Sequence, residues 1–145
     1  MFDNRRSGLA ITFLVALALT GGASAAHAEM MKMKATLAGT SEVPPNTSKG
    51  QGQATFDYDS GTKKLTWNIS YSGLTGPATA GHIHGPAAAN ANAGVAIPFA
   101  KPASPITGSA TLTEAQAADL VAGRMYVNIH TAAHPGGEIR GQIGK

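Results

Sequence analysis

The sequence has 145 residues, a formal net charge of +3 at pH 7 and no cysteine. This length favours a single domain, and the 11 Lys and Arg residues are spread along the chain instead of forming the basic stripe that nucleic-acid binding needs. Without cysteine the chain has no disulfide and no thiol for lipid attachment.

The first 28 residues have the pattern of a secretory signal peptide. Arg5 and Arg6 give a positive start, an apolar run follows over residues 9–19, and Ala26-His27-Ala28 fits a small-residue cleavage site. The apolar run is too short to span a bilayer comfortably. We therefore expect residues 1–28 to be removed and residues 29–145 to form an exported domain, periplasmic or extracellular, with no membrane span after cleavage.

Alternating apolar and polar residues predict strands in the first half of the expected domain. A first strand reaches Leu37, and the prolines at 44 and 45 then interrupt any ladder because they lack N–H donors. Residues 51–71 alternate on both sides of a turn at 59–62, which predicts a β-hairpin with one buried face. Trp67 is in phase with the apolar side chains, so we place it in the core.

The second half of the chain predicts further strands and one helix. Strands are expected at 81–86, 106–112, 125–130 and 139–143. Thr113 and Gln116 form a capping-box pattern at the start of a short helix that ends at Gly123. The total of about eight strands and one short helix indicates an all-β fold, either a β-sandwich or a flattened barrel.

Four histidines lie outside the expected signal peptide, in two short segments. His82 and His84 belong to GHIHGP, and His130 and His134 belong to YVNIHTAAHPGG. Successive side chains of a strand point to opposite faces, so His82 and His84 share one face. If the two strands are neighbours, the imidazole of His130 meets them on an outer surface of the sheet, and His134 joins from the following turn.

Other residues in and near these segments are candidates for supporting roles. Tyr126 and Asn128 would face the same way as His130, and Asn128, Glu138 or a backbone carbonyl could orient the imidazoles. Arg140 lies in an expected half-buried last strand, where it pairs with a carboxylate or holds loop carbonyls. Residues 87–105 are rich in Ala, Asn, Gly and Pro, and form either a cover over the histidines or a mobile surface loop.

The histidine pattern predicts a site for one transition metal ion. Imidazole nitrogens bind both copper and zinc, and the Irving–Williams order places Cu(II) ahead of Zn(II) at a nitrogen site. We therefore expect copper ahead of zinc, held by His82, His84, His130 and His134. The alternative is that the histidines lie on a solvated face or bind loop carbonyls, and that the domain is a non-catalytic extracellular interaction or matrix module without a metal.

We expect a binding protein and no catalytic residues. The chain has no Gly-x-Ser-x-Gly elbow and no His-Glu-x-x-His motif. Thr131 follows His130 directly, and neighbours in a strand face opposite ways, which argues against a nucleophile activated by this histidine. A redox enzyme with a single copper ion ranks third, after the metal-binding module and the interaction module.

Three motifs resemble, in their order along the chain, the CHRD domain family, a module repeated in chordin and found alone in bacterial secreted proteins. They are Glu42-Val43-Pro44-Pro45, Gly81-His82-Ile83-His84-Gly85-Pro86, and Tyr126-Val127-Asn128-Ile129-His130-Thr131 with Pro135-Gly136-Gly137-Glu138-Ile139-Arg140-Gly141. The resemblance runs from about residue 34 to residue 144.

The resemblance implies an immunoglobulin-like fold with limited similarity to copper/zinc superoxide dismutases. Those enzymes have a His-x-His strand, matched here by His82 and His84, and a later histidine, matched by His130. They also use more histidines, an aspartate and a disulfide, whereas this chain has four histidines after the expected signal peptide and no cysteine. A dismutase with two metal ions is therefore not expected.

Overall fold

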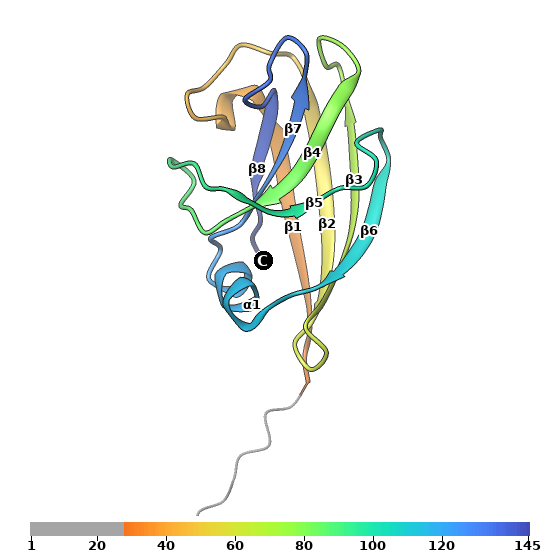
Figure 1. Ribbon diagram of the computed structural model, residues 1–145, viewed down its shortest axis with the longest axis vertical. Coiled ribbons are helices and arrows are strands. Elements are labelled where there is room, and N and C mark those ends of the chain that lie inside the picture. The colour runs from red at the N-terminus through yellow and green to blue at the C-terminus, as the bar shows by residue number, and fades with distance from the viewer. Residues whose placement is uncertain (1–27) are drawn as a thin grey trace, which may run out of the picture.

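Eight antiparallel strands form one sheet in the computed structural model, which describes residues 28–145 (Figure 1). The strands are β1 (Met30–Ala38), β2 (Gln51–Asp59), β3 (Lys64–Ser72), β4 (Ala78–His84), β5 (Val95–Pro98), β6 (Ile106–Thr111), β7 (Tyr126–Thr131) and β8 (Ile139–Gln142). A short 3₁₀ helix, η1 (Gly39–Ser41), follows β1, and one α-helix, α1 (Glu114–Val121), lies between β6 and β7.

The sheet curls into a nearly closed barrel. Its strand order is β5-β4-β7-β8-β1-β2-β3-β6, so β5 and β6 are the two edges. Buried apolar side chains from all eight strands and from α1 fill the interior. The expected all-β fold of about eight strands and one short helix is confirmed, and of the two expected architectures the flattened barrel describes it better.

The expected hairpin is the β2–β3 pair. Phe56 pairs with Trp67 across the two strands, and both side chains are buried in the core. In the turn, the Asp59 carboxylate accepts hydrogen bonds from the backbone N–H groups of Gly61 and Thr62 at 2.9 and 3.3 Å. This carboxylate closes the turn in the way that favours Asp at such positions.

The short helix α1 begins and ends as the sequence predicts. The Thr113 hydroxyl accepts from the Gln116 N–H at 3.2 Å, and the Gln116 side chain accepts from the Thr113 N–H at 3.0 Å. These two bonds make the predicted capping box. Gly123 follows the helix with φ +70°, a conformation that glycine adopts without strain.

The face of β7 and β8 opposite the core differs from the prediction. We expected an outer surface and a half-buried last strand, but Tyr126, Asn128 and Arg140 are at most 3% exposed. Two segments cover this face, because Glu42 contacts Asn128, and Arg140 contacts residues 88–92. Figure 1 shows the connection from β4 to β5 leaving the barrel and returning beside β7 and β8. The cover turns an exposed sheet face into a buried polar layer.

The expected signal peptide lies outside the described residues, apart from Ala28. Within residues 28–145, no helix is both long enough and apolar enough to cross a membrane.

Candidate metal centre

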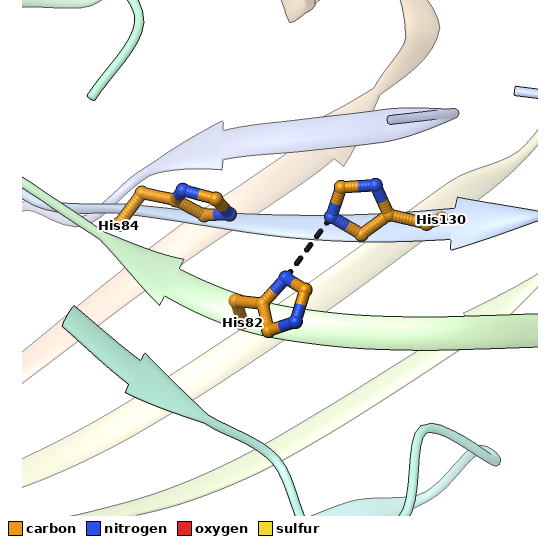
Figure 2. Close-up of side chains that lie close together, drawn as sticks. All are labelled: His82, His84 and His130. Atoms are coloured by element: carbon orange, nitrogen blue, oxygen red, sulfur yellow. Dashed lines mark hydrogen bonds between the residues drawn. The ribbon is translucent and has the colours of Figure 1, made fainter. Parts of the chain in front are cut away.

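Strands β4 and β7 bring three of the predicted histidines together. The strands pair antiparallel, with His82 opposite Asn128 and Ala80 opposite His130. The two histidine strands are therefore neighbours, which the predicted site required. One ring nitrogen from each of His82, His84 and His130 lies within 4.8 Å of the other two. Figure 2 shows the three rings turned toward a common point above the two strands. The group could hold a metal ion.

His82 and His130 make the closest contact in this group. Nδ1 of His82 lies 3.1 Å from Nε2 of His130 (Figure 2). Two nitrogens bound to one tetrahedral ion at 2.0–2.1 Å each are about 3.3 Å apart. The spacing of these two nitrogens therefore suits a shared ion, and without an ion one proton between the rings makes a hydrogen bond.

Backbone carbonyls orient the other side of two of the rings. Nδ1 of His84 lies 3.0 Å from the carbonyl oxygen of Ala93, and Nδ1 of His130 lies 2.9 Å from that of Pro135. A carbonyl oxygen only accepts, so both Nδ1 atoms carry the proton and both Nε2 atoms of the neutral rings carry a lone pair. This arrangement is typical of histidine ligands, whose second nitrogen is held by a carbonyl or a carboxylate.

The Nε2 atom of His84 is buried and has no hydrogen-bond partner within the described part of the chain. A buried acceptor without a partner costs about 1–3 kcal/mol, so such atoms are uncommon in folded proteins. Because the Ala93 carbonyl occupies Nδ1 of His84, Nε2 is the nitrogen that this residue can offer to the three-histidine group. An ion bound there would supply the missing partner.

The environment favours the neutral form of two of the rings. Burial lowers the pKa of His82, and the neighbouring His130 and His84 lower it further. Burial also lowers the pKa of His84, assisted by His130 and Arg140, while the hydrogen bond to Ala93 acts in the opposite direction. Because only a neutral imidazole binds a metal ion, both rings stay available below the pH at which free histidine becomes protonated.

His134 is not among the three histidines whose ring nitrogens lie within 4.8 Å of one another. It lies in the turn after β7, half-buried, and its backbone N–H bonds to the Thr131 carbonyl at 3.1 Å. The contribution of this turn to the group is the Pro135 carbonyl that orients His130.

The two predicted supporting residues contact other partners. Asn128 donates to the Glu42 carboxylate at 2.7 and 2.9 Å. Glu138 accepts from Ser48, Thr75 and Thr131, and burial, which would raise its pKa, is outweighed by these hydrogen bonds, which lower the pKa to about 2. Within residues 28–145, no hydrogen bond joins either residue to the three imidazoles.

The CHRD domain family matches residues 33–143. The chain belongs to this family. Comparisons with curated proteins and with solved structures found no similar protein. The motifs that carry the resemblance meet in space in this CHRD domain: GHIHGP and YVNIHT supply the three histidines on paired strands, and PGGEIRG supplies the buried Arg140 on β8.

In this CHRD domain, residues 88–93 form the covering segment over β7 and β8, and Tyr126 links this segment to the histidines. Its ring stacks on the His84 imidazole, with ring centres 5.0 Å apart and an angle of 4° between the planes. Its hydroxyl accepts from the Ala93 N–H at 3.1 Å and donates to the Ala93 carbonyl at 3.3 Å. Tyr126 therefore fixes both the ring of His84 and the carbonyl that orients this ring.

Arg140, on β8, holds the covering segment in place through hydrogen bonds. Its guanidinium donates to the carbonyls of Ala88 and Ala91 and to the Asn92 side chain, at 2.8–3.2 Å. Of the two roles expected for Arg140, pairing with a carboxylate or holding loop carbonyls, the structure shows the second. Asn92 in turn donates to the Val43 carbonyl, which joins the two covering segments.

Glu42 is a buried acid of the first motif that the sequence analysis did not assign to the site. Burial raises its pKa to about 7, although Arg140 and the hydrogen bond from Asn128 lower it. Gly137, with φ +132°, makes room for this contact, because a Cβ there would lie 2.6 Å from the Glu42 carboxylate. An acid before two prolines has no local pattern that would reveal a partner 86 positions away.

Proposed function

We propose that this CHRD domain is an exported module that binds one transition metal ion, copper ahead of zinc, through His82, His84 and His130. The observation that carries the proposal is the buried Nε2 atom of His84, which has no hydrogen-bond partner among residues 28–145 and belongs to the ring that lies with those of His82 and His130. Three neutral imidazoles are a ligand set that copper and zinc accept. The signal-peptide pattern of residues 1–28 supports export.

Copper is placed ahead of zinc for two reasons. Nitrogen sites bind Cu(II) more tightly than any other divalent ion of the first transition series. The group also lacks the thiolates and the fourth protein ligand that are common in structural zinc sites, so a structural zinc ion is disfavoured. Three protein ligands leave a coordination position for a water molecule or another external ligand.

Calorimetric titration of the protein lacking residues 1–28 with Cu(II) and Zn(II) tests the proposal. We expect one ion per chain, with submicromolar affinity for copper. The double variant His82→Ala/His84→Ala should lose this binding. His134→Ala is the matched control, because it removes an imidazole of the same segment outside the group of three, and it should bind as the unaltered protein does.

Absence of binding heat above that of buffer would overturn the proposal. The domain would then be better described as an extracellular interaction module, and partner capture that is equal with and without a chelator would support that description. Equal loss of binding in His134→Ala and in the double variant would show instead that His134 is required as a ligand.

A further inference from the structure

We propose that this site binds copper as Cu(I) in preference to Cu(II), because the buried guanidinium of Arg140 lies one aromatic ring behind His84 and forms no ion pair within residues 28–145. This inference rests on the metal site proposed above. It adds the oxidation state of the ion and names the residue that selects it.

Arg140 carries a positive charge in a place that water does not reach. The residue is 1% exposed, and its guanidinium donates to two carbonyls and one amide oxygen, all of which are neutral. Within residues 28–145, no carboxylate oxygen lies within 4.0 Å of it. Because arginine does not lose its proton in proteins, the charge is permanent.

The charge is close to the ligands. The guanidinium carbon lies 3.5 Å from the centre of the Tyr126 ring, and the centre of the His84 ring lies 5.0 Å from the same point, so Arg140 is at most 8.5 Å from the imidazole. The strand order β4-β7-β8 places the two residues on opposite sides of Tyr126.

The ligands themselves add no negative charge. All three are imidazoles, and neither a carboxylate nor a thiolate belongs to the group. A Cu(II) ion would therefore add two positive charges beside a fixed one, whereas a Cu(I) ion would add only one. An ion bound to His84 lies beyond its ring, and at an effective dielectric constant of about 20 one extra charge at roughly 9–12 Å weakens binding by roughly twentyfold to tenfold.

The Irving–Williams order does not oppose this preference, because it ranks divalent ions among themselves. Zn(II) carries the same two charges as Cu(II) and is disfavoured by Arg140 to the same extent. The preference for Cu(I) is therefore consistent with copper ahead of zinc, because Cu(I) carries one positive charge less than Zn(II).

Glu42 is the acid that could offset Arg140. Its carboxyl group accepts a hydrogen bond from the Asn128 side chain. Asn128 is the strand partner of His82, so only the Asn128 side chain separates Glu42 from the strand pair that carries the histidines. Burial raises the pKa of Glu42 to about 7, so the group is largely neutral in mildly acidic solution and ionised at pH 8. Ionised Glu42 should stabilise Cu(II) more than Cu(I), which is opposite to the effect of Arg140.

Competition titrations test the inference, with one chelator specific for Cu(I) under reducing, anaerobic conditions and one for Cu(II) in air. We expect the unaltered protein to bind Cu(I) more tightly. Arg140→Gln should lower the preference for Cu(I) about tenfold, which corresponds to a fall of about 59 mV in the reduction potential of a one-electron couple. Glu42→Gln at pH 8 should change the preference in the opposite direction.

Two controls separate charge from folding. Arg140→Lys keeps the charge and should keep the preference for Cu(I). Asn92→Ala removes a partner of Arg140 without changing any charge, so both affinities should fall together. If circular dichroism shows that Arg140→Gln does not fold, Glu42→Gln at pH 8 decides the matter.

Tighter binding of Cu(II) than of Cu(I) by the unaltered protein would overturn the inference while leaving the metal site intact. An unchanged preference in Arg140→Gln, or in Glu42→Gln at pH 8, would also overturn it. Failure of the unaltered protein to bind either ion would contradict the proposed function itself, and the inference would fall with it.

Discussion

Nδ1 of His82 and Nε2 of His130 lie 3.1 Å apart, although 48 positions separate the two residues along the chain. At this distance the two rings share either one proton or one metal ion, because two protonated imidazoles would repel each other. Protons and metal ions therefore compete for the same nitrogen atoms. The pH dependence of binding follows from this competition.

Metal affinity should change little between pH 8 and about 6.5 and should fall below that range. Burial and the neighbouring rings lower the pKa values of His82 and His84, so protons compete for these nitrogens only at more acidic pH than they do for free histidine. Competition titrations at half-unit pH steps measure this profile. A fall of tenfold or more between pH 8 and 7 would contradict the assigned neutral state of the rings.

Glu42→Gln should stabilise the protein at alkaline pH and leave it unchanged near pH 4. Burial raises the pKa of Glu42 to about 7, so between about pH 4.5 and 7 the unfolded chain releases a proton that the folded chain keeps. This group therefore makes the protein less stable as pH rises through that range. We expect a gain of about 2–3 kcal/mol at pH 8 from the variant, measured by urea unfolding. A loss of stability at pH 8 would contradict this account.

Glu138→Gln should have the opposite sign. The hydrogen bonds from Ser48, Thr131 and Thr75 outweigh the effect of burial and lower the pKa of Glu138 to about 2, so its ionised form stabilises the fold above about pH 4.5 and this contribution is lost as pH falls toward 2. The variant should cost about 2–4 kcal/mol in urea unfolding at pH 7. Glu114→Gln, which alters an exposed ion pair, should stay within about 0.5 kcal/mol. Equal effects of the two variants would refute the buried role of Glu138.

Tyr126→Phe should weaken metal binding by up to about tenfold, because the Ala93 carbonyl that orients His84 loses its bond to the Tyr126 hydroxyl. The lost hydrogen bonds should also cost about 1 kcal/mol of stability. Tyr71→Phe is the control, since its hydroxyl donates to the Pro102 carbonyl and contacts none of the three histidines. Both variants should lose similar stability, and calorimetry should find weaker binding in Tyr126→Phe alone.

Features that depend on local patterns could be predicted from the sequence. Alternation and turn residues place the β2–β3 hairpin, and the Thr113–Gln116 pair places the start of α1. Strand parity places His82 and His84 on one face, and the pairing of β4 with β7 then brings them to His130. The periodicity of residues within strands is strong enough to decide these points.

The covered face could not be predicted in the same way. Residues 88–93 are small or polar and have no periodicity, and they are held in place by Arg140 and Tyr126, more than 30 positions away. Parity placed Tyr126 and Asn128 opposite the core, but it gave no sign that a second layer covers them. The closeness of His134 to His130 in sequence suggested a fourth ligand; the group of three does not include His134, and the next residue, Pro135, presents its carbonyl to His130.

X-ray absorption at the copper edge, on protein loaded with one equivalent of copper, tests the central claim most directly. We expect three imidazole nitrogens at about 2.0–2.1 Å from the copper ion, with the outer-shell scattering of intact rings. The signal should lose imidazole scatterers in the His82→Ala/His84→Ala variant. A copper ion in the unaltered protein with one imidazole ligand or none would contradict the convergence of His82, His84 and His130 on a single ion.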